Sequence, residues 1–214
     1  MSKTTYDPKT TIVLASANPG KVREFSVLLA PFSLNVLSLA DFPELPEIAE
    51  TGSTFLENSL LKSMGISKAT GLIAVADDSG LIIDALNGDP GVRSARYSGS
   101  TGHSTDIDEQ NTALVLKNLE GTPHEQRTGR FFCAMSASTP QGKIITAEGA
   151  WEGFIATKPQ GENGFGYDPI FIDGASGVIS ATMSPEEKNA MSHRSLAVGK
   201  LLEQWPAFWQ EWLR

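Results

Sequence analysis

Two adjacent carboxylates, Asp77 and Asp78, end the apolar run LIAVADD and are the sharpest chemical signal in the sequence. Neighbouring side chains of a strand point in opposite directions, so one of the two is expected to face a cavity. A third carboxylate, Glu50, precedes the segment TGSTF. Carboxylates from separate segments, without a His/Cys set of zinc spacing, suit Mg²⁺, which takes oxygen ligands and keeps several waters. The alternative is a pair of ordinary turn carboxylates, which the local pattern alone does not exclude.

Lys21 follows Asn-Pro-Gly in SANPGK, where a phosphate-binding loop would place a lysine. The segment is not a P-loop, because Ala15 replaces the first glycine and Val22 replaces the hydroxyl residue that would hold the metal. The pattern nevertheless predicts a strand, a tight turn and a helix, and the start of a helix offers N–H groups and a positive dipole end to an anion. We therefore predict phosphate binding at this turn, with metal ligands elsewhere in the chain.

Two glycine-flanked segments supply further polar and aromatic groups. GVRSARYSG carries Arg93 and Arg96, for which a solvated loop is the simpler interpretation. GFGYDP combines rings, flexible backbone and a carboxylate: Phe165 or Tyr167 could stack on a nucleobase, and Asp168 could accept its N–H groups. A hairpin or bulge turn explains the same short pattern, so this motif is weak by itself.

The segment SPEEKNAMSHRS predicts a helix that begins after Ser184. Lys188 and His193 are five residues apart and would not share one face of a straight helix. We therefore predict a break, with Ser192 capping a second helix that opens at His193 and Arg194. At such a helix start the histidine N–H and the arginine guanidinium would be available as donors, although a structural role is the commoner one for a histidine.

The elements that must position these groups follow from local spacing. A buried strand is predicted over residues 11–16, followed by a helix capped by Asn18. A second helix is predicted from Thr54, whose capping-box spacing with Glu57 marks its start, to about Ala69. Glu57 is also a possible third metal ligand. The expected apolar stripe of this second helix comprises Leu56, Leu60, Leu61 and Met64.

On another face of that helix, Asn58 and Lys62 are four residues apart and would project side by side. LIAVADD is predicted to be a strand that ends in a turn at Ser79-Gly80, leading into LIIDAL. A third helix is predicted over residues 105–119, and the segments RTGRFFCAMSAS, GKIITAEGAW and GFIATKP have strand composition. QGENGFGYDPIF is predicted to be a loop leading into another strand. The mixed order of helices and strands predicts an α/β fold with a mixed sheet.

Composition limits the partners. Lys plus Arg number 17 against 25 Asp plus Glu, a net charge of −8, which argues against a surface that follows nucleic-acid phosphates. Cys133 is the only cysteine and lies in a predicted buried strand, so no disulfide can form within the chain and a cytoplasmic protein is expected. Only a short apolar run precedes Asn-Pro-Gly, so neither a membrane span nor a secretory signal is expected. We expect a flexible tail over residues 1–10 and one catalytic domain over 11–214.

Five segments together resemble the inosine triphosphate pyrophosphatase family, also called the Ham1 family. They are SANPGK, ETGSTFLENSLLK, ADDSGLIIDALNGDPGVRSARYSG, GFGYDPIF and EEKNAMSHR. Each motif is modest, but the five in this order and spacing are specific, and the resemblance extends from Thr11 to about Leu202. It implies a homodimer in which each chain has a long mixed central sheet with flanking helices and two lobes around an active-site cleft. It also implies Mg²⁺-dependent hydrolysis of ITP, dITP and XTP to the monophosphate and pyrophosphate.

The resemblance implies roles for individual residues at matching positions. It implies metal ligation by Glu50 and Asp78, with Asp78 also the general base and with Lys21 and Asp77 in the catalytic set. The residues for which it implies substrate contacts are Ser16, Ala17, Asn18, Pro19, Gly20, Lys21, Lys62, Ser79, Arg96, Phe165, Gly166, Tyr167, Asp168, Lys188, His193 and Arg194. Donors from His193 and Arg194 would read the 6-oxo edge that inosine and xanthosine share and adenosine lacks.

Departures from the family pattern are small: Ser59 and Ser63 stand where the family usually has Ala, and Glu162-Asn163 precede Gly164 where smaller residues are common. Two rival interpretations remain open. Related pyrophosphatases that prefer modified pyrimidine nucleotides share a similar site logic, and a substrate panel separates them. A nucleotide-binding regulator without turnover would bind ITP and release no pyrophosphate. A purely structural protein fits least well, because it has no use for five polar, glycine-rich segments.

Overall fold

The computed structural model describes residues 6–16, 22, 26–27, 30, 34–46, 48–100 and 104–213. Within these residues the strands form a six-stranded sheet with the order β2-β1-β3-β4-β5-β6. Strand β1 (Thr11–Leu14) pairs in parallel with β2 (Asn35–Ser38) and with β3 (Ile73–Ile83). Strand β5 (Ile144–Ile155) pairs antiparallel with β6 (Phe171–Asp173), and β4 spans Thr128–Ser138. The sheet is therefore mixed, and the predicted α/β class is confirmed.

The chain divides into two compact units. The first comprises Met1–Asp78, Ala134–Glu148 and Ala197–Arg214, and the second comprises Ser79–Cys133 and Gly149–Leu196. Strands β3, β4 and β5 each contribute residues to both units.

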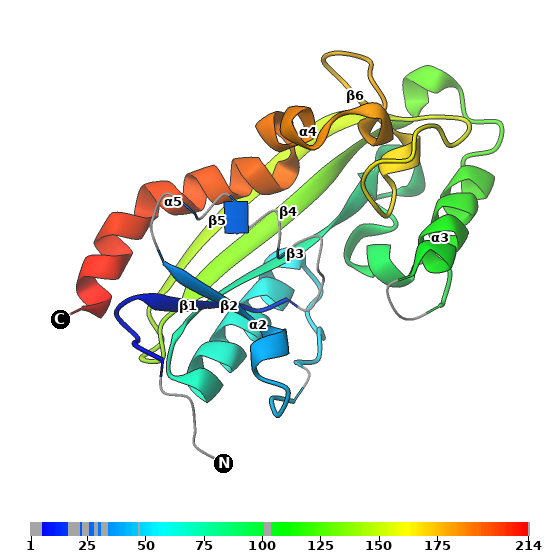
Figure 1. The fold of residues 1–214 in the computed structure, drawn as a ribbon. Helices are drawn as coiled ribbons and strands as arrows, with labels where there is room; N and C mark the ends of the chain where they lie inside the picture. Colours follow the sequence, from blue (N-terminus) through cyan, green and yellow to red (C-terminus); the bar gives the residue numbers. More distant parts are fainter. Residues whose placement is uncertain are drawn as a thin grey trace. The chain divides into compact units, whose positions relative to one another are not determined.

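In the first unit, helix α2 (Phe55–Thr70) begins and ends as its sequence predicts. The Thr54 hydroxyl accepts from the Glu57 N–H, and the Glu57 carboxylate accepts from the Thr54 N–H, which satisfies donors that the first turn leaves unpaired. Gly71 ends the helix in the left-handed region with φ 74°, where a side chain would be strained. Helix α5 (His193–Trp212) lies on the other side of the strands from α2 (Figure 1), and its Gln204 amide donates to Thr146 of β5.

The predicted apolar stripe of α2 is wrong. Leu61 and Met64 are 40% and 46% exposed, whereas Ser59, Ser63 and Ser67 are completely buried. The apolar core of this unit instead draws on residues in or next to the strands, together with one residue of α2, and its buried members are Val13, Ala15, Leu37, Ile66, Leu72, Ala74 and Ala76. The helix therefore presents a largely polar stripe to the sheet, which hydrophobic periodicity could not reveal.

In the second unit, helix α3 (Thr105–Asn118) starts at an N-cap, Ser104, and ends one residue before the predicted boundary. Helix α4 (Pro185–Met191) is capped by Ser184, and α5 begins at His193 after the single residue Ser192, as predicted. Arg127 is buried and donates to the main-chain oxygens of Leu119, Ile155 and Ala156, which ties the end of α3 to the end of β5. Burial lowers the pKa of this guanidinium.

One predicted turn is absent, and two segments predicted separately are one strand. Strand β3 continues through Ser79 and Gly80, so Asp77 and Asp78 lie within a strand and not at its end. The segments GKIITAEGAW and GFIATKP, whose composition predicted strands, contribute to one strand, β5, which begins at Ile144 and ends at Ile155. Glycine permits a turn but does not require one, and pairing with neighbouring strands keeps both segments extended. The helix predicted after Asn18 falls largely outside the described residues. Within those residues no helix is long and apolar enough to cross a membrane.

Candidate active site

A largely buried group of charged and polar side chains lies in the first unit, where α2 and the segment before it meet β3. The Asn58 amide donates to the Asp78 carboxylate at 2.9 Å, and the Lys62 ammonium lies 2.5 Å from the Glu50 carboxylate and 4.0 Å from that of Asp78. Asp77 and Asp78 are 3% and 8% exposed, so the interpretation as exposed turn carboxylates is wrong. Asn58 and Lys62 lie four residues apart on α2 and so share one face of the helix. From there they contact Asp78 and Glu50, which brings together the two carboxylates of the predicted metal site.

The electrostatics of this group are dominated by its carboxylates. Burial by itself would lower the pKa of Lys62, but the charges of Asp77, Asp78 and Glu50, and the hydrogen bond to Glu50, outweigh it and raise that pKa. Lys62 is therefore a permanent cation that balances part of the negative charge. Within the described residues no three His, Cys, Asp or Glu side chains are arranged to hold a metal ion. The donor set fits a cation held by one or two carboxylates, with water and substrate oxygens completing its shell, which is how Mg²⁺ is commonly bound.

Glu57 belongs to the helix cap. Its carboxylate accepts from the N–H and the hydroxyl of Ser53 and from the N–H of Thr54. These bonds, led by that from the Ser53 hydroxyl, lower its pKa. The capping role therefore explains Glu57, and the structure does not support Glu57 as a third metal ligand.

The predicted phosphate turn is only partly described. Ser16 follows β1, and its N–H donates to the Leu14 carbonyl at 2.8 Å. The rest of the turn, Ala17 to Lys21, lies outside the described residues.

A second group of polar and aromatic side chains lies in the second unit around the loop 163–168. The Asp168 carboxylate is 2% exposed and accepts from the Lys188 ammonium at 2.6 Å, the Ser180 hydroxyl at 2.8 Å and the Phe165 N–H at 2.9 Å. A Cβ on Gly164 would lie 2.0 Å from the same carboxylate, at a backbone φ of 83°. Asp168 thus joins the loop to α4, and its oxygens already have protein donors.

Phe165 is the exposed aromatic ring of this group. Its side chain is 36% exposed, and the Lys188 ammonium and the Arg194 guanidinium lie 5.2 and 5.3 Å from its ring centroid. Tyr167 is instead buried and donates its hydroxyl to the Ser94 carbonyl at 2.8 Å, and burial raises its pKa above the ordinary value. Of the two rings proposed to stack on a base, only Phe165 presents a face for stacking.

The His193 ring is 4% exposed and stacks on Phe131 with centroids 5.0 Å apart and an interplanar angle of 14°. His193 was expected to present an open imidazole at the helix start, but its ring is held against the core. Arg96 is exposed at the end of the 3-10 helix η4 (Gly91–Arg96), and Ser79 is partly buried in β3.

The sequence did not predict a role for Asp108. This residue of the first turn of α3 accepts from the Gly166 N–H at 2.7 Å, while Thr112 on the next turn donates to the Gly166 carbonyl at 3.5 Å. Both backbone groups of Gly166 are thus held by α3. Acidic residues are common in the first turn of any helix, so no local signal distinguishes Asp108 from a residue that stabilises the helix dipole.

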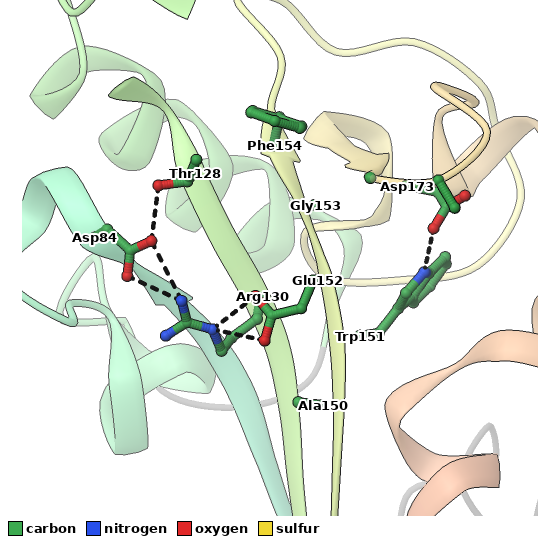
Figure 2. Close-up of a pocket in the computed structure, with 11 residues that line it drawn as sticks. Asp84, Thr128, Arg130, Ala150, Trp151, Glu152, Gly153, Phe154 and Asp173 are labelled. Atoms are coloured by element: carbon green, nitrogen blue, oxygen red, sulfur yellow. Dashed lines mark hydrogen bonds and ion pairs between the residues drawn. The ribbon is translucent and has the colours of Figure 1, made fainter. Parts of the chain in front are cut away.

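A hollow of about 620 Å³ in the second unit is lined by none of the predicted site residues. Figure 2 shows that Arg130 donates to both Asp84 and Glu152, and Thr128 also donates to Asp84. The bond to Glu152, followed by the charges of both carboxylates, raises the pKa of Arg130 despite partial burial. Two carboxylates around one guanidinium leave no positive charge for a phosphate, so the hollow lacks the chemistry that the sequence predicts.

Similarity to known sequences and structures supports the family that the five motifs indicate. The family model for the Ham1 family matches residues 12–204. The dITP/XTP pyrophosphatase of Nitratidesulfovibrio vulgaris is 55% identical over 204 residues, which cover 94% of this chain and 99% of the relative. That of Geobacillus kaustophilus is 49% identical, with 91% and 93% covered. The solved structure of a HAM1 protein from Coxiella burnetii has a TM-score of 0.81 and 41% identity, and the match covers 89% of this chain and 95% of that one. With nearly its whole length matched in sequence and in fold, the chain belongs to the Ham1 family.

Proposed function

We propose that this protein is a nucleoside triphosphate pyrophosphatase that hydrolyses dITP, ITP and XTP to the monophosphate and pyrophosphate. The observation that carries the proposal is the cluster of Glu50, Asp78 and Lys62, which pairs metal-binding oxygens with a permanent cation. Relatives that are 55% and 49% identical are named dITP/XTP pyrophosphatases, which supports the substrate class.

The first group is assigned to the triphosphate. Glu50 and Asp78 would hold Mg²⁺, which supplies charge neutralisation at the phosphates and lowers the pKa of a bound water. Asp78 is the proposed general base that orients and accepts a proton from the water attacking the α-phosphorus, and the Asn58 amide fixes its carboxylate at 2.9 Å. Lys62, together with Lys21 and the turn of residues 16–21, would neutralise charge on the departing pyrophosphate. Arg96 and Ser79 are further proposed substrate contacts.

The second group is assigned to the base. The exposed face of Phe165 would stack on the purine, and the ammonium of Lys188 and the guanidinium of Arg194 stand next to that ring as donors. Donors favour the 6-oxo acceptor of hypoxanthine and xanthine over the amino group of adenine, because ATP would leave a buried donor unpaired. His193, whose ring is stacked on Phe131, is the remaining residue proposed for this pocket, and the donors beside the base are assigned to Lys188 and Arg194.

Asp168, Gly166 and Tyr167 take supporting roles in this proposal. Asp168 already accepts three hydrogen bonds, so it orients Lys188 and the Phe165 backbone and is not the principal acceptor for the base. Tyr167 and Gly166 fix the loop through Ser94 and Asp108. A homodimer in the cytoplasm is the proposed working form.

The test measures pyrophosphate and orthophosphate separately after incubation with Mg²⁺ and, one at a time, dITP, ITP, XTP, GTP, ATP and dTTP. Pyrophosphate from the inosine and xanthosine nucleotides alone is expected. Asp78→Asn should lower kcat by about 10²- to 10⁴-fold, the usual contribution of a general base. The matched control, Asp84→Asn, alters a carboxylate of the hollow in Figure 2 and should retain kcat. Orthophosphate as the product, or ITP binding without turnover, would refute the proposal.

A separate variant tests the preference for ITP over ATP. Arg194→Ala should reduce the ratio of kcat/KM for ITP to that for ATP, because it removes a donor beside the stacking ring. Arg93→Ala is the control, since this arginine is exposed and pairs with Asp89. An unchanged ratio in Arg194→Ala would refute the assignment of the 6-oxo edge to this residue.

A further inference from the structure

A continuous chain of buried hydroxyl groups connects α2 to β4 in the first unit. Ser59 of α2 lies 2.8 Å from Ser136 of β4, Ser136 lies 2.7 Å from Ser63 of α2, and Ser63 lies 2.8 Å from Ser138 of β4. All four serines have zero exposure. Ser59 also donates to the carbonyl of Ala76 at 3.1 Å. The chain therefore begins two residues before Asp78 and continues along the interface between helix and strand.

Close packing alone does not explain these residues. A small side chain lets a helix approach a sheet, but alanine would serve equally well and has no polar group to bury. Burying a hydroxyl is unfavourable unless it is hydrogen-bonded, so the arrangement requires each serine to face its partner. Apolar contacts are non-directional and tolerate small rotations, whereas hydrogen bonds weaken steeply when their angles change. A hydroxyl chain thus specifies the rotation of α2 about its axis more strictly than an apolar stripe would.

That rotation decides where the neighbouring residues point. Asn58 and Lys62 each immediately precede one of the helix serines, so their side chains emerge about 100° around the helix axis from the serine stripe. They contact Asp78 and Glu50 from this position. A turn or slide of α2 that lengthens the serine contacts moves the amide and the ammonium away from both carboxylates at once.

We propose that Ser59, Ser63, Ser136 and Ser138 are positioning residues that hold Asn58 and Lys62 in register with Asp78 and Glu50. All four are completely buried, so the proposal gives them no contact with metal or substrate. The catalytic importance of this register rests on the proposed function, but the register itself is a property of the protein without ligand and can be measured there.

The experiment compares three variants of the full chain with the wild type: Ser59→Ala/Ser63→Ala, Ser136→Ala/Ser138→Ala, and all four substitutions together. The matched control is Ser67→Ala, which removes an equally buried serine of the same helix stripe whose hydroxyl donates to Leu72 and not to the chain. Each double variant leaves two hydroxyls facing methyl groups, whereas the quadruple variant makes the interface apolar on both sides and should recover much of the stability.

The first readout is made without metal or nucleotide. The side-chain amide of Asn58 is followed by NMR, because its hydrogen bond to buried Asp78 shifts its signals and slows their exchange with solvent. The second is Mn²⁺ affinity, from the electron paramagnetic resonance signal of the free ion. Melting temperature and the separate values of kcat and KM for ITP complete the set.

We expect faster Asn58 exchange in both double variants and in the quadruple variant, with Mn²⁺ affinity and kcat reduced about 10- to 100-fold, as for other residues that orient metal ligands. Ser67→Ala should leave all three near wild type. The decisive protein is the quadruple variant, in which stability returns but the Asn58 signals and Mn²⁺ affinity do not. If they return with stability, or never change, the serines only pack the helix and the proposal is overturned. If wild-type protein binds no Mn²⁺ or hydrolyses no ITP, the proposed function fails, and the Asn58 exchange still decides this inference.

Discussion

Replacing Lys62 by methionine should expose how much negative charge this one ammonium balances. Its side chain is 13% exposed and lies 2.5 Å from Glu50 and 4.0 Å from Asp78, whose side chains are 32% and 11% exposed. Methionine preserves the length of the aliphatic stem and removes only the charge. Glu50, Asp77 and Asp78 would then repel one another without a neighbouring cation.

The magnitude follows from the distances. A pair of unit charges 4.0 Å apart interacts by about 4 kcal/mol at an effective dielectric constant of 20. Removing one partner of a fully buried pair costs about 3–5 kcal/mol, and the partial exposure of Glu50 reduces this to about 2–3 kcal/mol. For a chain of 214 residues this corresponds to a fall in Tm of about 5–10 °C.

The assay is thermal unfolding followed by circular dichroism, in EDTA and in excess Mg²⁺. Lys62→Met should melt well below the wild type in EDTA and should gain more from Mg²⁺ than the wild type does, because the cation replaces the missing charge. Lys68→Met is the control, since Lys68 is exposed in the last turn of the same helix. Glu50→Gln/Lys62→Met should recover part of the loss.

Equal melting of Lys62→Met and Lys68→Met in EDTA would refute the electrostatic reasoning. A loss in EDTA that Mg²⁺ does not reduce would leave the charge balance intact but contradict metal binding by these carboxylates.

Two further predictions concern the second unit. Gly164→Ala should raise KM for ITP and lower Tm, because the new methyl group would meet the Asp168 carboxylate at a backbone φ of 83°. Gly166→Ala is the control, because the space around its Cβ is open. At its φ of 61° this substitution should cost only about 1 kcal/mol of stability. Equal effects of the two substitutions would contradict this. Burial by itself would raise the pKa of Asp173, but hydrogen bonds from Ser176, from the Trp151 indole and from backbone N–H groups outweigh it and lower that pKa. Asp173 therefore contributes stability above its unfolded-state pKa of about 3.9 that is lost as pH falls through the lower folded-state value. Asp173→Asn should lower the urea midpoint at pH 7 much more than at pH 2, and an equal difference at both pH values would show that the charge is not responsible.

Local sequence was sufficient for the parts of the fold that short-range geometry controls. Capping residues Thr54 and Ser184 marked two helix starts correctly, and the five-residue spacing of Lys188 and His193 correctly predicted the break before α5. Caps and helical spacing involve residues within one or two turns, so they can be read without knowing the rest of the fold.

Tertiary structure decided which side chains of α2 face the sheet and where β3 stays extended. The sequence of α2 suggests that leucine and methionine face the core, yet the sheet presents Ser136 and Ser138 there, and the buried stripe is serine. Ser79 and Gly80 allow a turn, but pairing within the sheet keeps β3 extended and places Asp77 and Asp78 in its interior.

The candidate site shows the same division. Residue types were enough to name Glu50 and Asp78 as candidate metal ligands, and the motif order placed Lys62 among the expected substrate contacts, but only the structure pairs Lys62 with Glu50. Only the folded chain shows that Asp168 already accepts three hydrogen bonds from protein donors and that Asp108, 58 residues from Gly166, accepts from its N–H. Hydrogen bonds across such separations depend on which elements pack together, and that is fixed by the whole fold and not by any segment of it.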